Sequence, residues 1–188
     1  MLRAAVRCFN EKGFHATSLD DVANALSVTK PTIYHYFGNK DEILFECVRR
    51  GLESIRDAAE AVEARAGGGL ERLRRLMLDY AVIMTMDFGK CVTLTADHEL
   101  SADSRARFRG LKREIDQTVR RVVEQGMADG TIAKGDPRLV TFTLTGALNW
   151  IARWYDPTGA LAPQQIAEGA VATLVAGLAP RRDNEERL

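Results

Sequence analysis

One stretch of the sequence gathers side chains that suit contact with nucleic acid. Lysine can meet a phosphate as a point charge, and threonine, histidine and tyrosine can form hydrogen bonds to phosphates or to base edges. Residues of these types fall on the outward side of a short predicted helix that begins at Lys30. They are Lys30, Thr32, Tyr34, His35 and Tyr36. Aromatic residues at helical spacing can also belong to a core, so the flanking elements must decide between the two interpretations.

Those flanking elements predict a helix, a turn and a second helix. Ser18 and Asp21 have the spacing of a capping box, which predicts a helix that begins at Leu19. Thr29 followed two residues later by Pro31 predicts another start, because a proline in the first turn gives up no helical hydrogen bond. Residues 27 and 28 form the bend between them. The inward positions are Val22, Ala23, Leu26, Ile33 and Phe37.

The overall charge of the chain does not by itself indicate a nucleic-acid or lipid partner. The sequence has 26 Lys plus Arg and 26 Asp plus Glu, so no global field draws it to an anionic polymer or surface. Residues 1–40 contain five basic and three acidic side chains, a local excess of two positive charges. Any such contact must therefore be local, and this segment is where we expect it.

Two runs, residues 13–23 (GFHATSLDDVA) and 28–44 (VTKPTIYHYFGNKDEIL), together resemble the DNA-binding domain of the TetR family. The resemblance implies a homodimeric transcriptional regulator, usually a repressor, that binds a double-stranded operator and carries an all-α ligand-binding region. By position in the motif, Thr17 and Lys40 would hold phosphates, and the residues of the second helix would face the major groove. The expected DNA-binding set is Thr17, Ser18, Lys30, Pro31, Thr32, Tyr34, His35, Tyr36 and Lys40.

The chain departs from the family pattern at two places. Ser27 stands in the turn where the family often has glycine, which costs little if that backbone is left-handed. Met1 falls in the middle of the family's first helix, so the usual basic residues ahead of it are absent. We expect either that the native start lies upstream or that DNA affinity is reduced. The alternative function is therefore a small-molecule-binding or interaction protein with impaired DNA binding.

The rest of the chain is also predicted to be helical, which makes the fold all-α. Apolar residues recur at helical spacing, and the alternating runs of β-strands are missing. We expect a helix-turn-helix domain at 1–39, a larger helical ligand-binding and dimerisation domain at 40–179, and a polar tail at 180–188. After three short helices in residues 1–37, a helix of about 25 residues begins at Lys40. Further helices are expected near 70–87, 91–99, 103–128, 137–154 and 163–177.

Apolar side chains of the central helices predict an internal pocket for a small-molecule effector. The candidates are Met77, Tyr80, Met84, Phe88, Phe108, Leu111, Ile115, Asn149, Trp150 and Arg153. Residues 146–157 are similar to a TetR subgroup that includes fatty-acid and acyl-CoA-responsive regulators, which implies an effector with an apolar tail and an acidic group. Arg153, or one of Arg72, Arg74 and Arg75, would bind that group. The alternative remains open that Trp150 and Trp154 are core or interface packing and that Arg153 caps an internal carboxylate.

The last two predicted helices have the properties of a dimer interface. The helix at 137–154 is apolar around much of its circumference and must be buried on two sides. Small residues on it and on the helix at 163–177 would allow close approach of a partner. The expected interface residues are Gly146, Trp150, Ala170 and Leu174.

Other chemistries find little support in the sequence, and we expect no enzyme activity, metal or cofactor. Three cysteines lack CxxC pairing, residues 97–99 lack the second histidine of a zinc hydrolase, and the glycines at 67–69 lack the context of a phosphate loop. The longest apolar stretch, residues 139–152, is too short and too polar to span a membrane. We expect a cytoplasmic protein with reduced thiols.

Overall fold

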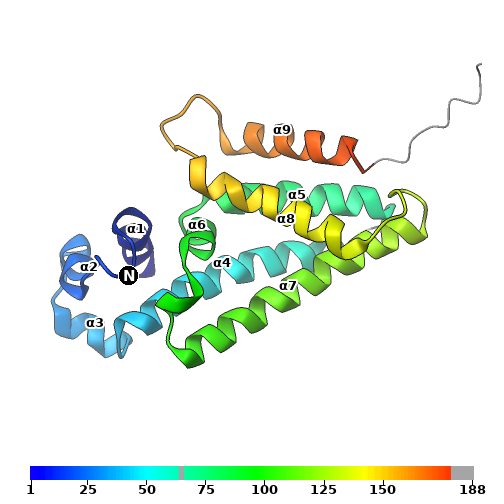
Figure 1. Ribbon diagram of the computed structural model, residues 1–188. Helices are drawn as coiled ribbons and strands as arrows, with labels where there is room; N and C mark the ends of the chain where they lie inside the picture. Colours follow the sequence, from blue (N-terminus) through cyan, green and yellow to red (C-terminus); the bar gives the residue numbers. More distant parts are fainter. Residues whose placement is uncertain (64–65, 179–188) are drawn as a thin grey trace, which may run out of the picture.

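The computed structural model describes residues 1–63 and 66–178, and this part of the chain is entirely helical (Figure 1). The helices of the N-terminal head are α1 (Leu2–Lys12), α2 (Leu19–Leu26) and α3 (Lys30–Tyr36). The body contains α4 (Lys40–Glu63), α5 (Gly69–Thr85), α6 (Asp87–Leu94), a 3₁₀ helix (Asp97–Glu99), α7 (Ala102–Ala128), α8 (Pro137–Trp154) and α9 (Pro163–Ala176). The expected all-α fold with an N-terminal helix-turn-helix is confirmed.

Local capping signals form the head as the sequence predicts. The Ser18 hydroxyl accepts a hydrogen bond from the Asp21 backbone N–H at 3.0 Å, and the Asp21 carboxylate accepts one from the Ser18 N–H at 2.7 Å. This capping box starts α2 at Leu19, and Pro31 lies in the first turn of α3. Ser27 closes α2 in the left-handed conformation, with φ 53° and ψ 40°, so the turn keeps the geometry that glycine favours.

Helix α4 joins the head to the body without a flexible linker. Its buried residues belong to the same apolar cluster as Val22 and Ile33 of the head and Leu73 and Phe108 of the body. In Figure 1, α4 runs from α3 along the body beside α7, and α1 packs on both α4 and α6. Helix α6 is therefore connected to the head through packed side chains.

Helix α5 lies at the centre of the body. It packs against α4 and α7 on one side and against α8 and α9 on the other, which gives the layers visible in Figure 1. At its N-terminus, α5 crosses α7 with Gly69 against Gly126, where a Cβ on Gly69 would lie 2.2 Å from the Cα of Gly126. Within the described residues, no helix is both long and apolar enough to cross a membrane.

The predicted helix at 91–99 is wrong. Helix α5 ends at Thr85, α6 occupies Asp87–Leu94, and residues 97–99 form a separate 3₁₀ helix. The chain reverses so tightly after α5 that a Cβ on Gly89 would lie 2.0 Å from the carbonyl oxygen of Ile83. Hydrophobic periodicity in the sequence does not predict such a close backbone contact. The expected polar tail at 180–188 and the domain end at 179 lie outside the described residues.

Candidate functional site

Helix α3 presents a polar and aromatic surface to solvent. Tyr34 and Tyr36 are 50% and 65% exposed, and Pro31 and His35 are exposed beside them. Thr32 is half-buried, and its hydroxyl lies 2.9 Å from that of Thr29. Exposed apolar groups that lie next to one another often mark an interaction surface, and here Ile33 alone anchors α3 in the core. The predicted second-helix residues thus lie together on one short helix and are available to a partner.

Lys30 forms an ion pair with Asp20, and a DNA phosphate could take the place of the Asp20 carboxylate. Its ammonium lies 2.9 Å from the carboxylate of Asp20. The Lys30 side chain is 43% exposed and the Asp20 side chain is 62% exposed. Asp20 raises the pKa of Lys30, which therefore stays charged. An exposed pair of this kind contributes little stability, so exchanging Asp20 for a phosphate costs little.

Thr17, one of the two residues expected to hold phosphates, forms hydrogen bonds within the head. Thr17 is 1% exposed, and its hydroxyl donates to the carbonyls of Gly13 at 2.8 Å and Cys8 at 3.1 Å. The buried hydroxyl is engaged within the loop between α1 and α2, so a phosphate contact by the Thr17 side chain would have to break these bonds, and that contact stays a prediction. Ser18 remains exposed, with its hydroxyl engaged in the cap of α2.

Lys40 fixes the same loop to the start of α4. Its ammonium donates to the carbonyls of Phe14 at 2.8 Å and Thr17 at 3.0 Å, and it lies 4.3 Å from the centre of the Phe14 ring. A phosphate contact by Lys40 would compete with these interactions. No local sequence signal reports this role, because its partners lie 23 and 26 residues away.

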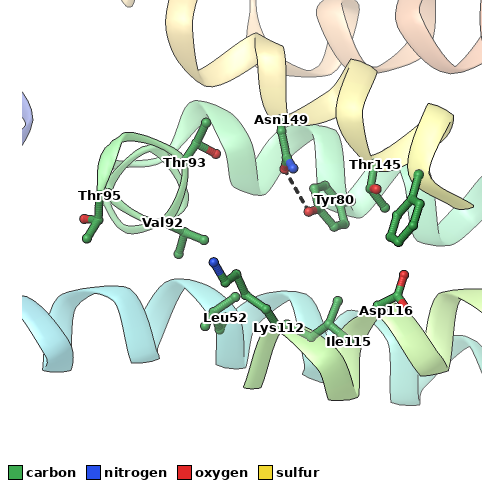
Figure 2. Close-up of a pocket in the computed structure, with 11 residues that line it drawn as sticks. Leu52, Tyr80, Val92, Thr93, Thr95, Lys112, Ile115, Asp116, Thr145 and Asn149 are labelled. Atoms are coloured by element: carbon green, nitrogen blue, oxygen red, sulfur yellow. Dashed lines mark hydrogen bonds between the residues drawn. The ribbon is translucent and has the colours of Figure 1, made fainter. Parts of the chain in front are cut away.

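The body contains a cavity of about 390 Å³ between α4, α5, α6, α7 and α8. Figure 2 shows its lining, in which the Tyr80 hydroxyl donates to the amide oxygen of Asn149 at 2.9 Å. Burial raises the pKa of Tyr80, so the phenol stays protonated as a donor. The lining comprises Leu52, Tyr80, Val92, Thr93, Thr95, Lys112, Ile115, Asp116, Phe142, Thr145 and Asn149.

Three of the ten candidate pocket residues, Tyr80, Ile115 and Asn149, line this cavity. Met77, Met84 and Phe108 are instead buried in the core, and Phe88 and Leu111 lie beside other surface depressions. Trp150 and Arg153 are exposed on the outside of α8 and do not reach the cavity.

Sequence reasoning found the polar Tyr80 and Asn149 but missed the other polar residues of the lining. Thr93, Thr95 and Thr145 face the cavity together with Lys112 and Asp116. Threonines inside otherwise apolar helices were the available signal, because a buried hydroxyl needs a partner. The cavity is thus a mixed surface that can bind an apolar group and several hydrogen-bonding groups.

Helix α6 lies between this cavity and the head. Thr95, just after α6, lines both the cavity and a second one of about 220 Å³, which is bounded by Phe9 and Phe14 of the head. At the other end of α6, Asp87 accepts a hydrogen bond from Arg7 at 3.0 Å, and its backbone carbonyl accepts one from Asn10 at 2.8 Å. A ligand that moves α6 would therefore move α1.

The outer face of α8 and α9 is an exposed apolar surface. Trp150 and Trp154 are 64% and 50% exposed, and a groove of about 430 Å³ runs between the two helices. Ala170 and Leu174 line the groove, and a Cβ on Gly146 would meet no atom within 4 Å. All four predicted interface residues lie on these two helices. Leu139 of α8 and Leu161 of the loop between the two helices are also large exposed apolar residues, as is Phe142, which lines the cavity.

The described residues offer no support for metal or thiol chemistry. No group of three or more His, Cys, Asp or Glu side chains among residues 1–63 and 66–178 could hold a metal ion. Burial raises the pKa of the Cys91 thiol to about 12, and it also raises the pKa of Cys47. Both thiols therefore stay protonated and unreactive.

A capped helix-turn-helix on a helical body with a partly open cavity is the arrangement expected of a DNA-binding regulator. Residues 1–47 match the pattern described as "Bacterial regulatory proteins, tetR family", and residues 66–178 match "Tetracyclin repressor-like, C-terminal domain". The chain belongs to the TetR family of transcriptional regulators.

Relatives and solved structures agree with this assignment. The transcriptional repressor KstR2 of Mycobacterium tuberculosis is 24% identical over 182 residues, covering 95% of this chain and 90% of KstR2. The structure of PfmR from Thermus thermophilus has a TM-score of 0.86 at 29% identity, covering 95% of this chain and 98% of PfmR. AibR, solved with isovaleryl coenzyme A and operator DNA, has a TM-score of 0.81 at 27% identity, and the match covers 93% of this chain and 95% of AibR.

Proposed function

We propose that this protein is a ligand-released repressor that binds a palindromic operator as a homodimer. The observation that carries the proposal is the position of α6, which lines the cavity with Val92 and Thr93 and contacts the head through Asp87. The repressor activity of KstR2 and the operator complex of AibR support the proposal.

The outer face of α8 and α9 is the proposed dimer interface. An exposed apolar patch of this kind usually marks an interface, and two-fold symmetry of the protein requires matching half-sites on DNA. Trp150 is better explained by this surface than by the ligand pocket, because 64% of the residue is exposed to solvent in a single subunit.

The proposed effector is an apolar-tailed acid, such as a fatty acyl-CoA or its free acid. AibR was solved with isovaleryl coenzyme A, and the cavity here joins the apolar Leu52, Val92 and Ile115 to hydrogen-bonding groups. Its volume of about 390 Å³ lies at the small end of the usual range for ligand pockets, roughly 300–1,000 Å³. A short acyl chain suits it better than a whole coenzyme A molecule.

Release follows from linkage between the two sites. A ligand changes DNA affinity only if it binds one arrangement of the two DNA-binding heads more tightly than the other arrangement. An effector that favours a cavity shape incompatible with the operator-bound spacing weakens DNA binding, and operator DNA weakens effector binding by the same factor.

Titration of a preformed operator complex tests this function. Free acids and acyl-CoAs from short to long chain length are compared in a fluorescence-anisotropy measurement. Short-chain members should release the DNA, and unrelated aromatic compounds should not. Release by the aromatic compounds alone would discard the lipid assignment and leave the repressor function intact. A complex that no compound releases would argue against ligand control.

A second candidate function is a small-molecule-binding or interaction protein with impaired DNA binding. The internal hydrogen bonds of Lys40 and the burial of Thr17 favour it, because each competes with an expected phosphate contact. Failure to bind any operator at low salt, with ligand binding retained, would favour this alternative.

Replacing Lys30 with alanine should weaken operator binding and lower its salt dependence. The expected change in slope is roughly one phosphate equivalent per subunit, because the ammonium contributes one counterion-releasing contact. The matched control is Lys134→Ala, an exposed lysine in the loop between α7 and α8 at the far end of the body (Figure 1). Equal slopes for both variants, measured by anisotropy across a series of salt concentrations, would place the contact surface elsewhere.

A further inference from the structure

Among the described residues that line the cavity, Lys112 carries the positive charge, and its counter-ion lies outside the lining. The Lys112 ammonium lies 3.0 Å from the carboxylate of Asp97, which also accepts a hydrogen bond from Arg109 at 2.5 Å. The same ammonium is 4.1 Å from the centre of the Phe108 ring. Figure 2 shows Lys112 reaching from α7 into the cavity. Asp97 belongs to the 3₁₀ helix between α6 and α7.

The charges at this end of the cavity do not balance. Arg109 and Lys112 share the single carboxylate of Asp97, which leaves one positive charge in excess. The other charged residue of the lining, Asp116, is paired with Arg120 one turn further along α7, so that pair is neutral. A ligand bound here therefore meets a net positive charge, which favours an anionic group over a neutral or cationic one.

The pair between Lys112 and Asp97 can also open at low cost. The two side chains are 42% and 32% exposed, and pairs exposed to this degree contribute little to stability. Asp97 keeps its bond to Arg109 after Lys112 leaves, so the carboxylate is not left without a partner. A long lysine side chain can then turn its ammonium to a new anion without moving α7.

We propose that Lys112 binds the anionic group of the effector, and that this anion replaces Asp97 as the ion-pair partner of Lys112. The proposal rests on the proposed function, for which it supplies the class of ligand and the sensing residue. A carboxylate and a phosphate share the required chemistry. The arginines at positions 72, 74, 75 and 153, which the sequence indicated for this role, do not line the cavity.

The 3₁₀ helix that holds Asp97 also leads to the head. Two residues beyond it, the Ser101 backbone N–H and hydroxyl donate to the carboxylate of Asp41 at 2.7 and 2.9 Å, and the Ser104 hydroxyl donates to it at 2.6 Å. Asp41 is in the first turn of α4, directly after the head. Glu99 lines the second cavity, at the contact with α1. Loss of the Lys112 contact leaves Arg109 as the remaining partner of Asp97 and so weakens the tie between this segment and α7, which gives a second route to the head beside α6.

The test compares acids with neutral molecules of the same shape. Calorimetry on the purified full-length protein without DNA would use straight-chain carboxylates from butanoate to dodecanoate, the matching primary amides, and octyl phosphate. The wild type should bind its best acid roughly tenfold or more tightly than the matching amide, the expected size for a charge-assisted contact. Octyl phosphate distinguishes a phosphate site from a carboxylate site. If neither a carboxylate nor octyl phosphate binds, or if acid and amide bind equally, the proposal is overturned.

Variants then locate the preference at Lys112. Lys112→Met should abolish the preference for acids, and Lys112→Arg should retain it. The matched control, Arg113→Met, removes the same charge from the next residue, which is exposed and outside the cavity lining, and should also retain the preference. A preference that survives in Lys112→Met would contradict the assignment.

Asp97→Asn should have the opposite effect. Removal of the competing carboxylate should raise affinity for the acid severalfold and reduce the factor by which the acid weakens operator binding. If Asp97→Asn instead binds the acid more weakly than the wild type does, the proposed replacement of Asp97 by the acid is contradicted. Operator binding without ligand is measured for every variant. Failure of all of them to bind DNA would count against the proposed function, and the acid preference would still decide the role of Lys112.

Discussion

Gly146→Arg is expected to convert the proposed dimer into monomers and to reduce operator affinity by roughly 100-fold or more. The loss is large because two linked heads bind a palindrome with an avidity that one head cannot reach. Gly146 lies on the outer face of α8, where an added side chain has open space in the single subunit, so the fold of each subunit should persist. Sedimentation and operator anisotropy measure the two effects.

Gly110→Arg is the matched control for this variant. Gly110 is also a helical glycine whose Cβ would meet no atom within 4 Å, but it lies on α7, away from the proposed interface. Both variants add one positive charge and one long side chain. The control should stay dimeric and bind the operator. A wild-type mass near 20.8 kDa at micromolar concentration, or a dimeric Gly146→Arg variant, would contradict the assignment of the interface.

Alanine at position 51 is expected to destabilise the protein, although alanine is the better helix former. A Cβ on Gly51 would lie 2.4 Å from the carbonyl oxygen of Phe88 and 2.6 Å from a methyl of Val92, so α6 could not keep its position against α4. Overpacking of this kind costs about 1–3 kcal/mol of unfolding free energy. In thermal unfolding, the Tm of the variant should be several degrees lower than that of the wild type.

Gly110→Ala should have the opposite sign. The added methyl group has open space there, so the gain in helix propensity of about 0.5–1 kcal/mol is not offset. Equal stability of Gly51→Ala and Gly110→Ala would show that α6 moves freely on α4. That result would remove the physical basis for transmission from the cavity to the head.

The head could be predicted from the sequence because its signals are local. Ser18 and Asp21 are three residues apart, and Pro31 lies in the helix that it starts, so each element begins where the pattern indicates. Roles that depend on distant partners could not be predicted. The bonds of Lys40 to Phe14 and Thr17 are visible only in the three-dimensional structure.

The cavity is harder to predict than the helices that form it. Hydrophobic periodicity identifies buried positions but does not separate a packed core from a cavity wall, so it places Met84 and Phe108 in the lining although they lie in the core. It misses Thr93 and Thr145 because they are polar, although they face the cavity. The reversal at Gly89 displaces the expected boundary of α6 by several residues, which changes the face that it presents.

The most direct test of the central claim is selection of genomic fragments from the source organism by the purified protein at low salt. A dimeric repressor with its exposed α3 surface should enrich a two-fold symmetric sequence, and scrambling one half-site should abolish tight binding. Binding of the selected site should weaken steeply as salt is raised. No enriched fragment at low salt, or enrichment without any symmetric element, would contradict the account.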